Sequence, residues 1–329
     1  MEDLQSLVGI PRIWDRLSTV EERLLQASTA DDSYLTKIAQ HLLIAGGKRF
    51  RPLLALLAAE FGDPEDHRPV EAAVAVELIH VGSLYHDDVI DEADTRRGAS
   101  SANANWTNSV AILAGDFLMA RASEVAATHL SQESVRLLAS TYAELVEGQT
   151  RELQLTDDLT HSLEDYQQVI GGKTASLIRT SARLGALAVD AEKAVVEALS
   201  TWAWEVGMVF QIADDALDLV ADEETIGKPA GSDIREGTFT GPVLRAVSGP
   251  HGDRVHEILA AGRPYSDEAV TEVISLVREG GHIDAALQTA ATRLTIAEAA
   301  LATLPTSKPK EILERLGAYL LERVESARA

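Results

Sequence analysis

The sequence contains no cysteine. This absence excludes disulfide bonds, thiolate catalysis, cysteine-ligated zinc and iron–sulfur clusters. Glycine (22 residues) and proline (10 residues) are too few for a low-complexity or fibrous chain, and a hydrophobic content of 46% is ordinary for a globular protein. The sequence therefore predicts a folded protein whose chemistry does not depend on thiols.

Basic residues and long apolar runs are also scarce. Asp and Glu number 52 against 29 Lys and Arg, which gives a formal net charge of −23. Such a surface repels nucleic acid phosphates and anionic membranes. The longest uncharged stretch, residues 98–115, is too rich in serine and asparagine to span a bilayer, and the acidic N-terminus lacks the features of a signal peptide. We expect a cytoplasmic protein with no nucleic-acid partner and no stable membrane insertion.

Helical periodicity runs through most of the chain. Apolar residues recur at helical spacing in residues 70–84, and no segment shows the sustained alternation of a strand. The same spacing recurs in residues 110–130, 135–155, 163–189, 194–220, 268–277, 283–301 and 312–324. The pattern predicts an all-α protein.

Helix-breaking residues separate these segments. Pro11, Gly46-Gly47 and residues 62–69 fall between predicted helices, and the longest non-periodic segment is 222–242. Loops of that length inside compact domains are usually functional. No change in composition divides the chain. We therefore expect a single domain over residues 1–329, with an N-terminal helical segment at 1–30 and a functional loop at 222–242.

Two aspartate clusters share one spacing. They are Asp87-Asp88-Val89-Ile90-Asp91 and Asp214-Asp215-Ala216-Leu217-Asp218, and each ends an apolar helical segment. Positions i and i+4 lie on one face of a helix, so Asp87 pairs with Asp91 and Asp214 with Asp218. Because like charges at this spacing repel, a hard divalent cation is the natural partner. The repeated spacing favours Mg²⁺ shared with substrate phosphates over a solvated acidic surface.

The few cations lie beside glycines and aspartates. Guanidinium and ammonium groups are the usual ligands of diphosphates. The cations in such places are Lys48, Arg49 and Arg51 after Gly46-Gly47, Arg96 and Arg97 after the first cluster, Lys173 after Gly171-Gly172, and Lys228 in the long loop. In so acidic a chain, this placement indicates an anionic substrate bridged by metal.

These motifs together resemble the trans-polyprenyl diphosphate synthase family, long-chain type, from about residue 30 to the C-terminus. They are GGKRFRP at 46–52, YHDDVIDEADTRRG at 85–98, GGKTA at 171–175, FQIADDALD at 210–218 and GKPAGSDIREG at 227–237. The resemblance implies a single large helical bundle of the isoprenoid synthase type, in which the two aspartate motifs face each other across a central cavity. It also implies a homodimer.

The resemblance assigns carboxylates to metal and cations to diphosphates. The implied direct ligands of three Mg²⁺ ions are Asp87, Asp91 and Asp214, and the aspartates that bind Mg²⁺ directly or support these ligands are Asp88, Asp215 and Asp218. The implied ligands of the allylic diphosphate are Arg96, Lys173 and Lys228. Those of isopentenyl diphosphate are Lys48, Arg51, His80 and Arg97. The side-chain oxygens that face the developing allylic cation are those of Thr174 and Gln211.

The implied reaction is Mg²⁺-assisted condensation of isopentenyl diphosphate with geranyl, farnesyl or geranylgeranyl diphosphate. Gly82 and Ser83 are small at positions where bulky aromatics close the pocket of short-chain members. We therefore expect an all-trans product of six or more isoprene units (C30 or longer), such as a quinone side-chain precursor. The other interpretation of Gly82 is close helix packing. Tyr85 is expected to point elsewhere, and Thr238 stands where many relatives have a lysine, so one diphosphate contact is expected to be missing.

Four alternatives stay open. A short-chain farnesyl or geranylgeranyl diphosphate synthase would share every motif. A class I terpene cyclase shares the fold and the first aspartate motif but usually carries an Asn/Ser/Glu triad in place of the second. A regulatory subunit of a heteromeric synthase tends to lose aspartates, whereas all six are present here. The last alternative is an acidic helical scaffold that binds divalent ions by chance.

Overall fold

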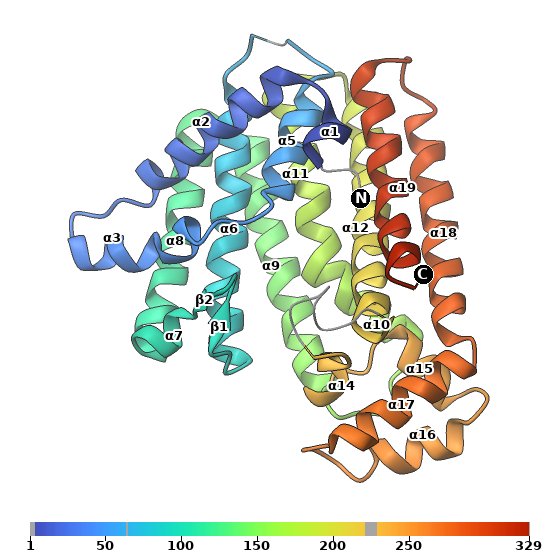
Figure 1. Ribbon diagram of the computed structural model, residues 1–329. Helices are drawn as coiled ribbons and strands as arrows, with labels where there is room; N and C mark the ends of the chain where they lie inside the picture. The colour runs from blue at the N-terminus through green and yellow to red at the C-terminus, as the bar shows by residue number, and fades with distance from the viewer. Residues whose placement is uncertain (1–3, 64, 221–228, 329) are drawn as a thin grey trace. The chain divides into compact units, whose positions relative to one another are not determined.

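The computed structural model describes residues 4–63, 65–220 and 229–328. Helices make up most of these residues, as Figure 1 shows. The strands in this part of the chain are the two-residue pair β1 (Thr95–Arg96) and β2 (Ala99–Ser100), which form an antiparallel hairpin. The predicted all-α class is confirmed. None of the described helices combines the length and the apolar character needed to cross a membrane.

The chain forms two compact units. Among the described residues, the N-terminal unit contains 4–142 and 177–200, with the gap at residue 64, and the C-terminal unit contains 143–176, 201–220 and 229–328. The helices α9 (Gln132–Leu155) and α12 (Lys193–Val220) contribute residues to both units.

The N-terminal unit is built around α6 (Arg68–Ile90), on which α2 (Pro11–Ala27), α5 (Phe50–Ala59) and α8 (Asn108–His129) pack. Apolar residues occupy every face of the middle of α6, so the helix is buried on nearly all sides. The other elements of this unit are α1 (Leu4–Val8), α3 (Ser33–Ala39), α4 (His41–Ile44), β1, β2, α7 (Ala102–Asn105) and nearly all of α11 (Ser176–Ala188).

In the C-terminal unit, α10 (Leu163–Ile170) continues directly into η1 (Gly171–Ala175), a single π-helical turn. The other elements of this unit are α14 (Ser232–Arg235), α15 (Gly241–Val247), α16 (Gly252–Leu259), α17 (Asp267–Glu279), α18 (His282–Leu301) and α19 (Lys308–Arg328). The backbone of η1 lies directly on α9, because a Cβ atom on Gly148 would come 2.5 Å from the amide nitrogen of Lys173. Only glycine at position 148 permits this approach. Single π-helical turns often mark functional sites.

The predicted helices agree closely with α6, α8, α9, α12, α17, α18 and α19. The segment predicted at 163–189 contains α10, η1 and α11, and the π-helical turn between the two helices was not predicted. In the predicted loop 222–242, the described residues include the short helix α14. Lys228 lies outside the described residues.

Candidate active site

The first aspartate motif lies at the end of α6. Asp91 caps the helix and is exposed, whereas Asp88 is fully buried and accepts a hydrogen bond from Arg96 Nε at 2.6 Å. The other carboxylate oxygen of Asp88, Oδ2, is buried without a hydrogen-bond partner. Burial raises the pKa of Asp88, and Arg96 opposes that rise. The motif therefore presents one exposed carboxylate and one buried acceptor oxygen that suits a cation.

The hairpin after α6 directs its two arginines to different partners. Arg97 and Gly98 form the turn and have φ values of 55° and 75°, as the central residues of a type I′ turn require. Arg96 bonds to Asp88, whereas Arg97 donates to the backbone carbonyls of Leu42 (3.0 Å) and Gly46. The two adjacent arginines therefore contact different parts of the chain: Arg96 contacts the first aspartate motif, and Arg97 contacts the loop at Gly46-Gly47.

A group of buried and partly buried polar side chains, the arginine cluster, consists of Arg49, Arg51, Glu77, His80 and Arg97. Glu77 is 1% exposed, and its Oε1 atom lies 3.1 Å from Arg49 Nη1 and 3.8 Å from Arg97 Nη2. Burial lowers the pKa of Arg51 to about 10 and holds that of His80 well below 6.5. His80 is therefore neutral, and its Nε2 atom accepts from Arg51 Nη1 at 3.3 Å.

The second aspartate motif lies near the end of α12. Asp214 is exposed, whereas Asp215 and Asp218 are buried. Asp215 accepts hydrogen bonds from the Tyr166 hydroxyl at 2.5 Å and from Gln211 Nε2 at 2.8 Å. Burial raises the pKa of Asp215 well above its usual range. Neutral donors therefore orient this carboxylate, in contrast to the cation that binds Asp88.

Two predicted catalytic residues lie on η1. Lys173 forms an ion pair with Glu152 of α9. Thr174 donates a hydrogen bond to Gln211 Oε1 at 2.8 Å, and Gln211 donates in turn to Asp215. The structure therefore joins three predicted residues, Thr174, Gln211 and Asp215, in one hydrogen-bonded chain that ends at Tyr166.

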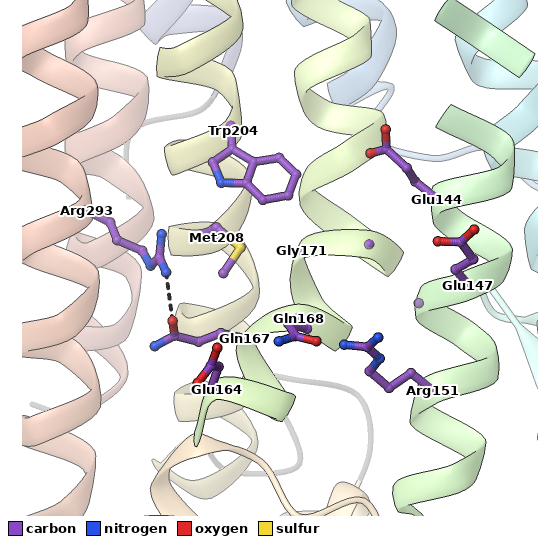
Figure 2. Close-up of a pocket in the computed structure, with 12 residues that line it drawn as sticks. Glu144, Glu147, Arg151, Glu164, Gln167, Gln168, Gly171, Trp204, Met208 and Arg293 are labelled. Atoms are coloured by element: carbon purple, nitrogen blue, oxygen red, sulfur yellow. Dashed lines mark hydrogen bonds between the residues drawn. The ribbon is translucent and has the colours of Figure 1, made fainter. Parts of the chain in front are cut away.

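A cavity of about 420 Å³ in the C-terminal unit also touches η1. Figure 2 shows Trp204 and Met208 of α12 beside it, and Arg293 of α18 donating a 3.1 Å hydrogen bond to Gln167. The other lining residues are Glu144, Glu147, Gly148, Arg151, Glu164, Gln168, Gly171 and Gly172. The cavity shares the η1 turn with Lys173 and Thr174, although no residue of the predicted site lines it.

The two positions predicted to set product length are buried in α6. A Cβ atom on Gly82 would lie 3.1 Å from the carbonyl oxygen of Gly115 and 2.9 Å from Met119 Cε, so Gly82 allows close packing on α8. The Ser83 hydroxyl donates to the His80 carbonyl at 2.8 Å. Tyr85 points elsewhere, because its hydroxyl donates to the carbonyl of Ile38 in α3.

The donor set suits a hard divalent cation. Among the residues that the structure describes, no three carboxylate or imidazole groups converge into a ready-made cage. In the N-terminal unit Asp91 is exposed and Oδ2 of Asp88 has no hydrogen-bond partner, and in the C-terminal unit Asp214 is exposed, so each motif by itself offers oxygen ligands. This arrangement fits Mg²⁺, which keeps water and phosphate oxygens among its ligands.

Several functional candidates carry no sequence signal that would have identified them. Glu77, Glu152 and Tyr166 are single residues outside the motifs, and only the fold brings them to Arg49, Lys173 and Asp215 respectively. Arg49 belongs to a recognisable run of cations, but its burial does not follow from that run.

Comparisons with known proteins show the family to which this chain is similar. The polyprenyl synthetase family model matches residues 32–277. The nonaprenyl diphosphate synthase of Mycobacterium tuberculosis is 41% identical over 98% of this chain and 96% of its own. Heptaprenyl diphosphate synthase component 2 of Geobacillus stearothermophilus is 40% identical over 94% of this chain and 96% of its own.

Among solved structures, the geranylgeranyl pyrophosphate synthase of Corynebacterium glutamicum, complexed with calcium and isoprenyl diphosphate, is similar to this chain at a TM-score of 0.85. The two are 43% identical, and the match covers 95% of this chain and 96% of that one. The resemblance that the motifs indicate is thereby confirmed. With its two aspartate motifs and its arginine cluster, this chain belongs to the polyprenyl synthetase family.

Proposed function

We propose that this protein is a trans-prenyltransferase, which condenses isopentenyl diphosphate with geranyl, farnesyl or geranylgeranyl diphosphate. The observation that carries the proposal is the presence, in a member of this family, of six motif aspartates together with an arginine cluster suited to a diphosphate. Calcium and isoprenyl diphosphate in the related Corynebacterium structure support both the substrate class and a divalent metal.

The carboxylates hold the metal. Asp87, Asp91 and Asp214 would bind Mg²⁺ directly, three ions in all, and Asp88, Asp215 and Asp218 would be further or supporting ligands. Bound Mg²⁺ would neutralise the leaving diphosphate, so that the allylic C–O bond can ionise. The hydrogen bonds from Tyr166 and Gln211 fix the orientation of Asp215.

The cations hold the diphosphates of the two substrates. Arg96, Lys173 and Lys228 bind the allylic diphosphate, which leaves with the electron pair of the broken C–O bond. Lys48, Arg51 and Arg97, together with the neutral ring of His80, bind isopentenyl diphosphate, whose double bond forms the new C–C bond. Loss of a proton to the departing diphosphate restores an allylic product. The oxygens of Thr174 and Gln211 stabilise the developing cation, and no protein nucleophile takes part.

A matched set of aspartate variants tests the chemistry. Asp87→Ala and Asp214→Ala should each lower turnover by at least about 100-fold, because electrostatic stabilisation of the departing charge is lost. The surface variant Asp253→Ala, at the exposed start of α16, is the control and should retain wild-type turnover. Full activity of either motif variant, or of the wild type in excess EDTA, would contradict the proposal.

The proposed product is all-trans and has six or more isoprene units, and named relatives include both longer and shorter synthases. Ser83→Phe should shorten it, because the ring would occupy space that a growing chain needs. A substitution at Gly82 would not test product length cleanly, because any side chain at that position would overlap α8. Leu84→Phe is the control, because its position is rotated by about 100° on the helix. An unchanged product length in Ser83→Phe would refute this role for α6.

We further propose a homodimer, for which α8 supplies an apolar surface. Ile112 and Leu113 are 42% and 63% exposed on this helix. Leu113→Glu should weaken association, which light scattering would detect as a smaller mass at micromolar concentration.

The single domain over residues 1–329 and the cytoplasmic location stay predictions.

A further inference from the structure

Glu77 is a buried carboxylate to which the motifs assign no role. It lies within the arginine cluster, with Arg49 Nη1 at 3.1 Å and Arg97 Nη2 at 3.8 Å from its Oε1 atom. The side chains of Glu77 and Arg49 are 2% and 4% exposed. Charges buried to this degree are stable only when they are paired and hydrogen-bonded. Without Glu77, three guanidinium groups would share a space with little water.

Arg49 has no donor left for a substrate. Its Nε and Nη2 atoms donate to Glu21 at 2.5 and 2.9 Å, and Nη2 also donates to the Leu43 carbonyl at 2.9 Å. Its Nη1 atom donates to Glu77 and to the Gly46 carbonyl at 3.1 and 3.4 Å. A guanidinium has five N–H donors, and these five contacts use all of them. Arg49 therefore connects α2, α6 and the loop before α5.

Arg51 and Arg97 differ from Arg49 in this respect. The Nε atom of Arg51 is buried and has no hydrogen-bond partner, and the Nη1 atom of Arg51 meets the neutral ring of His80. The hydrogen bonds of Arg97 to the carbonyls of Leu42 and Gly46 both leave from Nη1. These two guanidiniums keep donors for an anion, whereas Arg49 does not.

We propose that Glu77 is a positioning residue for isopentenyl diphosphate. Together with Arg49 it holds Arg51 and Arg97 in place before the diphosphate arrives, and neither Glu77 nor Arg49 contacts the substrate. The inference rests on the proposed function, because it names a supporting residue of the same site.

Two physical effects of Glu77 predict opposite results, which makes the proposal testable. If Glu77 acted only through its charge, its removal would make the site more positive and would strengthen diphosphate binding. If it positions Arg51 and Arg97, its removal lets these guanidiniums separate and weakens binding. We expect positioning to dominate, because Glu77 and Arg49 are buried and Arg97 lies 3.8 Å from the Glu77 carboxylate.

The experiment compares Glu77→Gln with wild type in steady-state kinetics and in calorimetric titration with isopentenyl diphosphate. The KM and the Kd for isopentenyl diphosphate should rise about tenfold, since the amide keeps an acceptor oxygen but loses the charge that strengthens the contacts with Arg49 and Arg97. The kcat and the KM for farnesyl diphosphate should change less than about threefold. Glu77→Asp, which keeps the charge, should recover most of the affinity.

Glu71→Gln is the matched control. Glu71 is also a buried glutamate of α6, and it pairs with Arg23 at 2.8 and 2.9 Å. It should lose thermal stability without a change in the KM for isopentenyl diphosphate. If Glu77→Gln does not fold, Glu21→Gln takes its place, because Glu21 holds Arg49 from an exposed position, and about a threefold rise in KM is expected.

The outcomes separate the two proposals. A wild-type protein without turnover would contradict the proposed function. An active wild type whose Glu77→Gln variant shows an unchanged or lower KM for isopentenyl diphosphate would overturn the positioning role alone. A rise of equal size in Glu71→Gln would also overturn it, since the effect would then follow from general destabilisation of α6.

Discussion

The arginine cluster of the N-terminal unit and the Thr174–Asp215 chain of the C-terminal unit hold their polar groups in different ways. In the arginine cluster, charges meet charges, because Arg49 is matched by Glu21 and Glu77. In the Thr174–Asp215 chain, a buried carboxylate meets the neutral donors of Tyr166 and Gln211. An ion pair cancels charge, whereas the neutral donors orient Asp215 without placing a positive charge beside it. The second arrangement suits a group that supports a cation.

The η1 turn of the C-terminal unit is held in a third way, by close packing of its backbone on α9 beside the ion pair between Lys173 and Glu152. Gly148→Ala would place a methyl group 2.5 Å from the amide nitrogen of Lys173. We expect a loss of about 1–3 kcal/mol in unfolding free energy from this overlap. Turnover should fall about 100-fold, because Lys173 and Thr174 would be displaced. Turnover within threefold of wild type would show that η1 does not need this contact.

Substitution of the second aspartate of each motif, Asp88 or Asp215, has the next largest expected effect, which is on the free energy of unfolding. Asp88→Asn leaves Arg96 without its buried counter-ion and should reduce the unfolding free energy by about 2 kcal/mol, a value discounted because Arg96 is partly exposed. Asp215→Asn keeps an oxygen that accepts from Tyr166, and it should lose only about 1 kcal/mol. Urea denaturation of both variants measures the difference. Equal losses would remove the distinction between the two motifs.

The smallest expected effect is the pH dependence from His80. Burial beside arginines holds the pKa of this histidine well below 6.5, so below pH 6.5 the unfolded chain takes up a proton that the folded chain does not. Its contribution to stability is therefore present above pH 6.5 and is lost as the pH falls. Between pH 7 and 5, wild-type unfolding free energy should fall more steeply than that of His80→Gln, by up to about 1.4 kcal/mol per pH unit. Parallel curves would mean that His80 titrates normally in the folded protein.

The sequence predicts the long helices and the metal motifs because each has a repeating pattern. Apolar spacing identifies α6, α8, α9 and α12, and the i, i+4 carboxylates identify a cation site. The π-helical turn at η1 has no such pattern, since it depends on how closely Gly148 packs. The hairpin at residues 95–100 is too short to show alternation.

The partners of the motif residues were also beyond prediction from sequence. Glu77 and Tyr166 lie on helices far along the chain from Arg49 and Asp215, and nothing in the local spacing connects them. Burial decides their roles, because a buried charge or hydroxyl needs a partner wherever the fold brings one. The contact between Met119 of α8 and Gly82 of α6 also depends on the fold, because nothing in the local spacing connects these two residues.

The most direct test sizes the products of the wild-type protein. Purified protein would be incubated with Mg²⁺, isopentenyl diphosphate and, in separate reactions, geranyl, farnesyl or geranylgeranyl diphosphate, and the dephosphorylated products would be identified by mass spectrometry. We predict a ladder of all-trans products that ends at six or more isoprene units. Products that end at fifteen or twenty carbons would contradict the proposed length. No elongation with any allylic primer would contradict the proposed reaction itself.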